Sequence, residues 1–176
     1  MNKKIGLFYG STTCYTEIAA EKITSSIETI LGGQAVVSHN IAFEPLASMV
    51  NYDYLILGIP TWDYGELQED WETHWDSINA IDFKDKKIAI YGLGDQVGYP
   101  DWFQDALGYL WEKVVHLGAI TVGDWPNKGY DFANSRALNK DKSLFVGLAL
   151  DFENQSEIVD TLIHKWCKQV LKDFGF

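Results

Sequence analysis

The feature that most constrains the fold is a regular alternation along the chain between short apolar runs and stretches with helical periodicity. The apolar runs lie at residues 4–9, 35–40, 54–59, 87–93 and 119–122, with a further one at 144–150. Helical patterns separate them, at about residues 16–30, 46–50, 66–78, 102–117 and 156–174. Such alternation is typical of parallel strands that are buried on both faces and connected by helices. It predicts an α/β fold with a doubly wound five-stranded parallel sheet, for which 2-1-3-4-5 is the favoured strand order.

One segment breaks the alternation. Residues 124–142 are rich in Gly, Asn, Asp and Lys, and Pro126 and Gly129 are turn formers. We interpret this segment, called the insertion below, as an interruption of the last strand and not as a linker between domains. A length of 176 residues then fits one domain over residues 1–176.

Charge and cysteine usage exclude several classes of function. The net charge is −11, from 25 acidic and 14 basic side chains, and Arg136 is the only arginine, so phosphate-neutralising contact with nucleic acid is not expected. No run approaches 18 apolar residues and no basic leader precedes an apolar run, so we expect neither membrane insertion nor secretion. Cys14 and Cys167 lie far apart without a CxxC pattern, which argues against a disulfide framework or a zinc site. These observations predict a cytoplasmic protein without a metal.

The turn after the first apolar run is rich in hydroxyl groups. Ser11, Thr12, Thr13, Cys14, Tyr15 and Thr16 lie between that run and the first helical pattern. An anion at a helix N-terminus is stabilised by backbone N–H groups and by the helix dipole, so this turn is a candidate phosphate site. The Gly-Lys-Ser/Thr of a nucleotide-hydrolysing loop and the GxGxxG of a dinucleotide site are absent from it, and Ala20 stands where a tyrosine phosphatase needs Arg. The alternative is a polar turn that only caps a helix.

Two more loops should reach the same edge of the sheet, because the carboxyl ends of parallel strands meet there. The third strand is followed by Pro60, Thr61, Trp62, Asp63, Tyr64 and Gly65, and the fourth by Gly94, Asp95 and Tyr99. Trp62 and Tyr99 could hold a flat ring between them, although a loop Trp often serves only as a packing lid. The glycines would let backbone groups approach a ring edge. The implied ligand has a phosphate at one end and an aromatic plane at the other.

Acidic side chains gather just after the Trp62 loop. Asp63, Glu66, Glu69, Asp70 and Glu72 fall within ten positions. Such a cluster is either a solvated helix face or a surface that attracts a basic partner.

Taken together, these motifs resemble the long-chain flavodoxins. The resemblance covers essentially the whole chain and is carried by the phosphate turn, PTW before an acidic helix, GLGDQVGYPDWFQDALG, WPNKGYDF and GLALDFENQ. It is closest to the bacterial B-type, or second, flavodoxins, whose phosphate loop also carries Cys. The resemblance implies a flavodoxin-like fold, non-covalent FMN and single-electron transport without turnover of a substrate.

The resemblance also implies a set of cofactor contacts. Phosphate would bind at Ser11, Thr12, Thr13, Tyr15 and Thr16, the ring would lie between Trp62 and Tyr99, Asp95 would face the pyrimidine edge, and Asp151 would lie toward the ribityl chain. The full expected set is Ser11, Thr12, Thr13, Cys14, Tyr15, Thr16, Pro60, Thr61, Trp62, Asp63, Tyr64, Gly65, Leu93, Gly94, Asp95, Tyr99, Asp101, Gln104 and Asp151. Two departures stand out: Cys14 replaces a usual Gly, and Asp63 occupies a position where Gly or Asn is frequent.

The implied role is that of a low-potential electron carrier. Carboxylates around the cofactor, with no Lys or Arg at the phosphate, would disfavour extra negative charge on a reduced flavin. The expected partners are a flavodoxin/ferredoxin-NADP reductase and acceptor redox enzymes, which would dock on the acidic rim around Asp63, Glu66, Glu69 and Asp70, with the carrier as a monomer. The alternatives are a flavodoxin-like NAD(P)H:quinone reductase, which would need one open flavin face, and a receiver domain, whose acidic pair and Lys are not evident.

Overall fold

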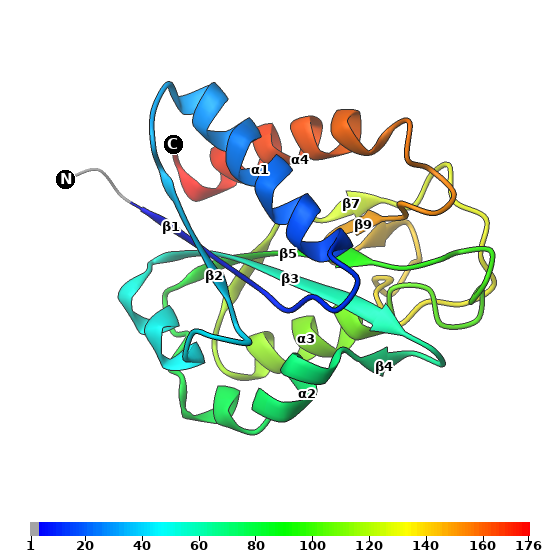
Figure 1. Cartoon of the computed structure of the whole chain (residues 1–176), viewed down its shortest axis with the longest axis horizontal. Coiled ribbons are helices and arrows are strands. Elements are labelled where there is room, and N and C mark those ends of the chain that lie inside the picture. Colours follow the sequence, from blue (N-terminus) through cyan, green and yellow to red (C-terminus); the bar gives the residue numbers. More distant parts are fainter. Residues whose placement is uncertain (1–3) are drawn as a thin grey trace.

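The computed structural model describes residues 4–176 and consists of a parallel sheet covered by helices on both faces (Figure 1). The elements are β1 (Ile5–Tyr9), α1 (Tyr15–Leu31), β2 (Val36–Asn40), η1 (Leu46–Asn51), β3 (Tyr54–Trp62), β4 (Glu66–Leu67), α2 (Glu69–His74), η2 (Ser77–Ala80), β5 (Lys87–Leu93), α3 (Asp105–His116), β6 (Ile120–Val122), β7 (Trp125–Pro126), β8 (Leu144–Phe145), β9 (Leu148–Leu150) and α4 (Val159–Phe174). Helices α1 and α4 lie on one face of the sheet, and α2 and α3 on the other.

The strand order is β2-β1-β3-β5, with both β6 and β9 paired in parallel to β5. β6 pairs with residues Lys87 to Ala89 of β5, and β9 pairs with residues Tyr91 to Leu93. These two short strands together form one edge strand, interrupted by the chain that leaves after β6 and returns before β9. The predicted 2-1-3-4-5 order is therefore confirmed, and the last strand is interrupted as predicted.

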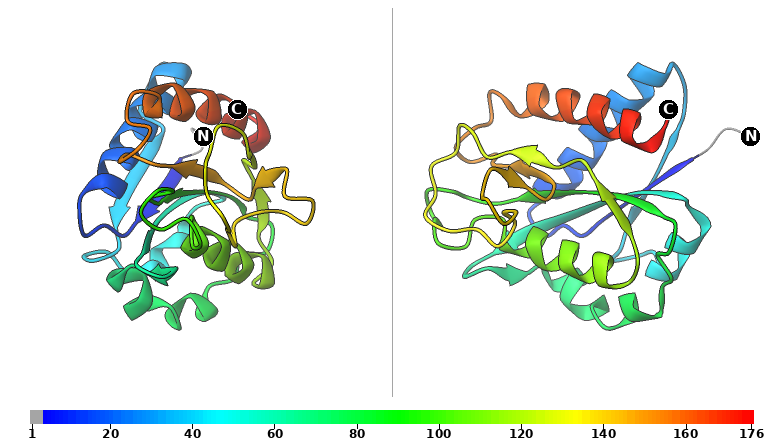
Figure 2. Two further views of the ribbon diagram at one scale, coloured as in Figure 1. Left: turned by 90° about the vertical axis from the view of Figure 1, so that its right-hand side faces the viewer. Right: turned by 180° about the vertical axis from the view of Figure 1, so that it is seen from behind.

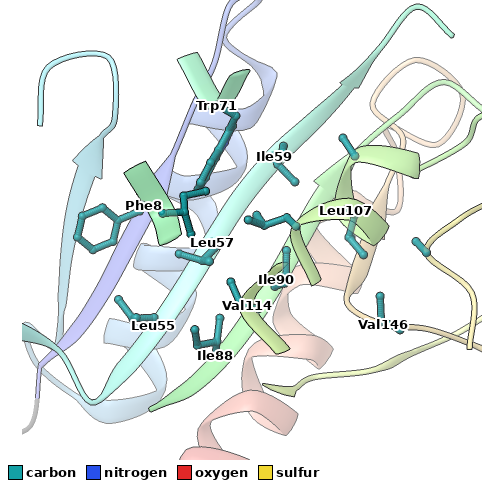
Figure 3. Packing of buried hydrophobic residues seen from close by; sticks show 14 of the residues in the cluster. Phe8, Leu55, Leu57, Ile59, Trp71, Ile88, Ile90, Leu107, Val114 and Val146 are labelled. Atoms are coloured by element: carbon teal, nitrogen blue, oxygen red, sulfur yellow. The ribbon is translucent and has the colours of Figure 1, made fainter. Parts of the chain in front are cut away.

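Side chains that alternate along the central strands form two cores. Leu55, Leu57 and Ile59 of β3 face α2 and α3, where Trp71 and Leu107 pack against them (Figure 3). The intervening positions of the strands face α1 and α4 and pack on α4 side chains such as Trp166, which is fully buried. Side chains of a strand alternate between its two faces, so a strand covered on both faces needs apolar residues at successive positions. This explains why the apolar runs in the sequence are continuous.

The structure corrects the helix expected at residues 66–78. Glu66 and Leu67 instead form β4, which pairs antiparallel with the end of β3, and the helical part is limited to α2 and the short η2. The chain reverses at Gly65, whose φ of +86° suits glycine. The turn at Gly65 thus places Glu66 and Leu67 in a strand and not in the expected helix.

Other boundaries shift by a few residues. The apolar run 144–150 is not one strand, because β8 pairs with β7 in a separate ribbon whereas β9 joins the main sheet. β3 continues through Trp62, which we expected in a loop. Helix α3 begins at Asp105, after Gln104 adopts a left-handed conformation with a φ of +65°. Within residues 4–176, no helix is long and apolar enough to cross a membrane.

Candidate functional site

A cavity of about 190 Å³ opens at the carboxyl ends of the strands, where four loops converge. The loops follow β1, β3, β5 and β9. The cavity is lined by Thr13, Tyr15, Thr16, Pro60, Thr61, Trp62, Asp63, Leu93, Gly94, Asp95, Tyr99, Trp102, Phe103, Phe152 and Glu153. Three predicted loops therefore meet at one site, together with a fourth that follows the last strand.

The loop of residues 10–16, called the phosphate loop below, connects β1 to the first turn of α1. Its entry is tightly packed, because a Cβ atom at Gly10 would overlap the buried side chain of Gln68. Gln68 donates a hydrogen bond from Nε2 to Thr12 Oγ1 (3.1 Å). Ser11 Oγ is buried and, within residues 4–176, has no hydrogen-bond partner. Since buried polar atoms are nearly always paired, this hydroxyl is a donor that a ligand could satisfy.

Cys14 caps the N-terminus of α1 in a left-handed conformation, with φ +67° and ψ −12°. The left-handed region costs a non-glycine residue roughly 1–2 kcal/mol. Its backbone carbonyl accepts the first helical hydrogen bond, from Ile18 N–H (2.8 Å), and its side chain is exposed. Cys14 therefore adopts a backbone angle that suits glycine, and the strain remains in the loop.

The Trp62 loop starts inside the sheet. Thr61 Oγ1 accepts a hydrogen bond from Ala106 N–H in the first turn of α3 (3.0 Å), which links the end of β3 to the start of that helix. Asp63 lines the cavity and, like Cys14, is a non-glycine residue with a positive φ, here +40°. Tyr64 is 68% exposed and lies edge-on to Trp102 (5.0 Å between ring centroids).

The Tyr99 loop, residues 94–101, is held by its own side chains. Asp95 Oδ1 accepts hydrogen bonds from Val97 N–H (3.0 Å) and Gly98 N–H (2.8 Å), and a third from Asn154 Nδ2 (2.9 Å). Burial acts to raise the pKa of Asp95, but these hydrogen bonds outweigh it and lower the pKa below its ordinary value. The Asp95 carboxylate thus accepts hydrogen bonds from its own loop, and Asp95 also lines the cavity.

The other eight expected contact residues lie outside the cavity lining: Ser11, Thr12, Cys14, Tyr64, Gly65, Asp101, Gln104 and Asp151. Three of them connect loops to each other. Gln104 donates from Nε2 to the Leu150 carbonyl (3.0 Å), Asp101 accepts from Asn134 Nδ2 (3.4 Å), and Asp151 is fully buried among donors from its neighbours. Their roles in ligand binding stay predictions.

Four lining residues were missed: Trp102, Phe103, Phe152 and Glu153. Phe152 and Glu153 follow Asp151 in the loop after β9. The rule that selected the other loops would have found them had it been applied to the loop after the apolar run that ends at Leu150. Phe152 stacks on Tyr15 with 5.2 Å between ring centroids and 19° between planes. The final loop thereby contributes an aromatic wall beside the phosphate loop.

The loops around the cavity carry charge of one sign. Residues 10–16, 60–72, 94–104 and 151–158 contain ten Asp and Glu and no Lys, Arg or His. Glu69, Asp70 and Glu72 occupy the first turn of α2, where the helix dipole favours negative charge. Within residues 4–176, no group of three or more His, Cys, Asp or Glu is arranged to hold a metal ion.

Fold and cavity together define a doubly wound α/β protein with a ligand cavity beside the switch point of its sheet. Comparison with known proteins narrows this class. Residues 7–166 match the family model described as Flavodoxin. "Flavodoxin 2" of Salmonella typhi is 51% identical over 171 residues, covering 97% of this chain and 96% of the relative. A flavodoxin of Synechococcus elongatus is 48% identical over 173 residues, 98% of each chain. The crystal structure of Fusobacterium nucleatum flavodoxin bound to flavin mononucleotide matches with a TM-score of 0.90 at 28% identity, covering 97% of this chain and 98% of the other.

The chain belongs to the flavodoxin family. Flavodoxins are electron-transfer flavoproteins, so this protein carries electrons between redox partners and does not turn over a substrate of its own. The resemblance to the second flavodoxin type is confirmed, and the quinone reductase alternative is not favoured.

Proposed function

We propose that the protein holds FMN in the cavity at the carboxyl ends of its strands, with the phosphate at residues 11–16 and the ring between Trp62 and Tyr99. FMN, which supplies one-electron chemistry when bound, is the cofactor of this electron carrier. The observation that carries the proposal is that Thr13 and Thr16 line the same cavity as Trp62 and Tyr99. One space therefore offers hydroxyl donors at one part and aromatic side chains at another.

The phosphate loop fits an anion better than it fits a simple helix cap. Ser11 Oγ is a buried donor that the described protein residues leave unpaired, and α1 directs its N-terminal N–H groups into the same loop. Although Cys14 is the N-cap residue, its side chain makes no capping hydrogen bond in the described structure. Hydroxyls and N–H groups, rather than a cation, would thus hold the phosphate.

The charge around the cavity supports a low-potential carrier. A single carboxylate ~10 Å from another negative charge, at an effective dielectric of ~20, raises its free energy by ~1.7 kcal/mol before screening by salt. For a one-electron couple that corresponds to roughly 70 mV. Ten carboxylates with no basic side chain in the four loops would therefore disfavour reduction to an anion.

The same charges support a docking role. Asp63, Glu66 and Glu69 are exposed beside the cavity, and Asp70 is half-buried. We propose that this acidic rim receives the basic faces of a flavodoxin/ferredoxin-NADP reductase and of acceptor redox enzymes, in transient contacts accelerated by charge. The carrier would work as a single-domain monomer, since copies with a net charge of −11 repel one another, and in the cytoplasm, where its two free thiols would stay reduced.

The cavity assignment is tested by titrating apoprotein with FMN. We expect Trp62→Ala and Tyr99→Ala each to raise the dissociation constant about tenfold or more, because a stacked ring contributes ~0.5–1.5 kcal/mol beyond its burial. Tyr109→Ala is the matched control, since Tyr109 is a partly exposed aromatic residue of α3 outside the cavity, and should change affinity less than twofold. Unchanged affinity in both cavity variants would refute the assignment.

The docking surface is tested by the rate at which an NADPH-dependent flavodoxin reductase reduces the FMN-loaded protein. Glu66→Gln/Glu69→Gln should slow reduction at low salt, and the difference from wild type should shrink as salt screens the charges. Glu21→Gln/Glu112→Gln removes the same charge from exposed positions on α1 and α3. Equal slowing in both double variants would show that net charge alone causes the effect and would contradict docking at the acidic rim.

A further inference from the structure

The insertion contacts the Tyr99 loop on both sides of Tyr99. Asp131 N–H donates to Gln96 Oε1 (2.6 Å). Beyond Tyr99, the Pro100 carbonyl accepts from Ala133 N–H (2.9 Å) and Asn134 N–H (3.0 Å). The insertion and the loop after β5 also lie at the same end of the sheet, as the right-hand view of Figure 2 shows. Its backbone therefore holds the loop that carries one aromatic wall of the cavity.

Gln96 is the centre of these contacts. Its side chain is buried, with 4% of the residue exposed, and uses both of its polar atoms. While Oε1 accepts from the insertion, Nε2 donates to Asp151 Oδ2 (2.9 Å), and the Gln96 backbone N–H donates to the same oxygen (3.0 Å). A single side chain thus joins three segments that are distant in sequence: the Tyr99 loop, the insertion and the loop after β9.

Asp151 extends the network back toward the cavity. It is fully buried, and its Oδ1 accepts from the backbone N–H groups of Glu153 (3.1 Å) and Asn154 (3.0 Å). Asn154 Nδ2 in turn donates to Asp95 Oδ1, which closes the network on the Tyr99 loop. Both Asp95 and Glu153 line the cavity.

Tyr99 itself has little direct support. It is 39% exposed, and its ring meets Tyr64, which is more exposed, at 6.5 Å between centroids. Its backbone bonds join residues on its own side of the cavity, from Tyr99 N–H to Asp95 O (3.0 Å) and from Trp102 N–H to Tyr99 O (3.3 Å). The position of the ring consequently follows the position of its loop.

We propose that Gln96 is a positioning residue for FMN, and that the insertion holds the Tyr99 wall of the cavity through it. The inference rests on the proposed function, in which Tyr99 stacks on the ring. A loop fixed before the ligand arrives loses less entropy on binding, and buried hydrogen-bonded partners are the usual means of fixing it. Gln96 does not line the cavity, so its effect on FMN passes through the Tyr99 loop, whose Asp95 and Tyr99 do line it.

The test compares Gln96→Met with Gln155→Met. Gln155 Nε2 donates to the Gly129 carbonyl (2.6 Å), so the control also removes a side-chain bond to the insertion, but one that joins it to the loop after β9 and not to the Tyr99 loop. We expect Gln96→Met to raise the FMN dissociation constant about tenfold, the lower end of what losing an orienting partner costs in metal sites, and Gln155→Met to change it less than twofold. The visible circular dichroism of bound FMN should change only in Gln96→Met, because it reports the geometry of the ring and its neighbours.

Gln96→Glu is measured in parallel, because it keeps an acceptor for Asp131 N–H but places a second carboxylate oxygen against Asp151 Oδ2. It should lose at least as much affinity as Gln96→Met at neutral pH and regain part of it as pH falls and the two carboxyl groups share a proton. Wild-type affinity and dichroism in the Gln96 variants, or an equal loss in Gln155→Met, would overturn the inference. If the Gln96 inference fails while Trp62→Ala and Tyr99→Ala still weaken FMN binding, the assignment of FMN to the cavity stands. Unchanged FMN binding in Trp62→Ala and Tyr99→Ala would instead refute that assignment.

Discussion

The phosphate loop and the Tyr99 loop both line one cavity but are stabilised in different ways. In the phosphate loop, Ser11 Oγ is buried without a described partner and Cys14 holds a strained backbone angle. In the Tyr99 loop, Asp95 and Gln96 direct their polar atoms to protein groups, and Asp151 joins the loop to the rest of the fold. The protein therefore satisfies the polar groups of the Tyr99 loop by itself, whereas it leaves the Ser11 hydroxyl for the phosphate that we propose to bind there.

This difference separates two quantities that mutations can change. Substitutions in the phosphate loop should act mainly on ligand affinity, because the groups removed contribute little to the unliganded fold. Substitutions in the network beneath the Tyr99 loop should act first on the stability of the apoprotein. The following predictions test that separation.

The largest effect is expected at Asp151. Asp151→Ala leaves two buried donors of Gln96, its backbone N–H and its Nε2, without their acceptor, and each unpaired buried donor costs about 1–3 kcal/mol. The partly buried N–H groups of Glu153 and Asn154 lose the same acceptor. Urea unfolding of the apoprotein should show a loss of roughly 3 kcal/mol or more. Asp131→Ala, an exposed carboxylate whose backbone N–H is retained, should stay within about 0.5 kcal/mol. Similar losses in both variants would contradict the buried network.

Next comes Ser11→Ala, which should separate affinity from stability. A hydrogen bond to a charged group contributes about 1.5–3 kcal/mol, so FMN should bind roughly 10- to 100-fold more weakly. The unfolding free energy of the apoprotein should change by less than about 0.5 kcal/mol, because the hydroxyl has no partner within residues 4–176. Ser25→Ala, at an exposed position of α1, controls for loss of a hydroxyl. A stability loss in Ser11→Ala equal to its affinity loss would remove the contrast between the loops.

A smaller gain is expected from Cys14→Gly. Glycine relieves the left-handed backbone at φ +67°, which should stabilise the apoprotein by about 1 kcal/mol, with FMN binding retained. Cys14→Ala keeps the Cβ atom and the strain while removing the thiol, so calorimetric melting of both variants distinguishes the two contributions. Equal stabilities would show that the backbone angle is not the source, and complete loss of FMN binding in Cys14→Gly would reveal a role of the thiol.

The smallest effect concerns pH and Asp95. Burial would raise the pKa of this carboxyl, but hydrogen bonds from Gly98, Asn154 and Val97 lower it below the ordinary value of 3.8. A lowered folded-state pKa adds stability above the unfolded-state pKa, and this stability disappears as pH falls through the folded-state value. The unfolding free energy of wild type should exceed that of Asp95→Asn at neutral pH, with a difference that shrinks below about pH 4. A difference constant over that range would show that Asp95 does not act through its charge.

Much of the fold follows from local pattern, because buried parallel strands require continuous apolar runs. The apolar runs that end at Tyr9, Ile59 and Leu93 identified the strands. Because the carboxyl ends of parallel strands meet at one edge, Trp62 and Tyr99 were expected at the same site, and both line the cavity. The extent of the last strand was harder, because the continuous run 144–150 hides a change of sheet between Phe145 and Leu148. Whether a strand joins the main sheet or the separate β7-β8 ribbon depends on tertiary pairing, which the apolar run itself does not encode.

The site was predictable where chemistry and position coincide. Thr13, Trp62 and Tyr99 are chemically distinctive residues in loops that a strand precedes. Trp102 and Phe103 were missed because they fall in a segment with helical periodicity, yet α3 begins only at Asp105. Gln104 causes that late start through its left-handed angle, a conformation that side-chain periodicity does not signal.

The pairing of β5 has a consequence for chain length. Val122 is the register partner of Ala89 and Leu148 that of Tyr91, so the chain leaves the sheet edge and returns to it across a gap of one position, at Ile90. The 25 intervening residues therefore span almost no distance along the strand. A chain that bridged Val122 to Leu148 with a single residue opposite Ile90 would preserve the register of the edge strand. The sheet therefore makes no demand on the length of this segment.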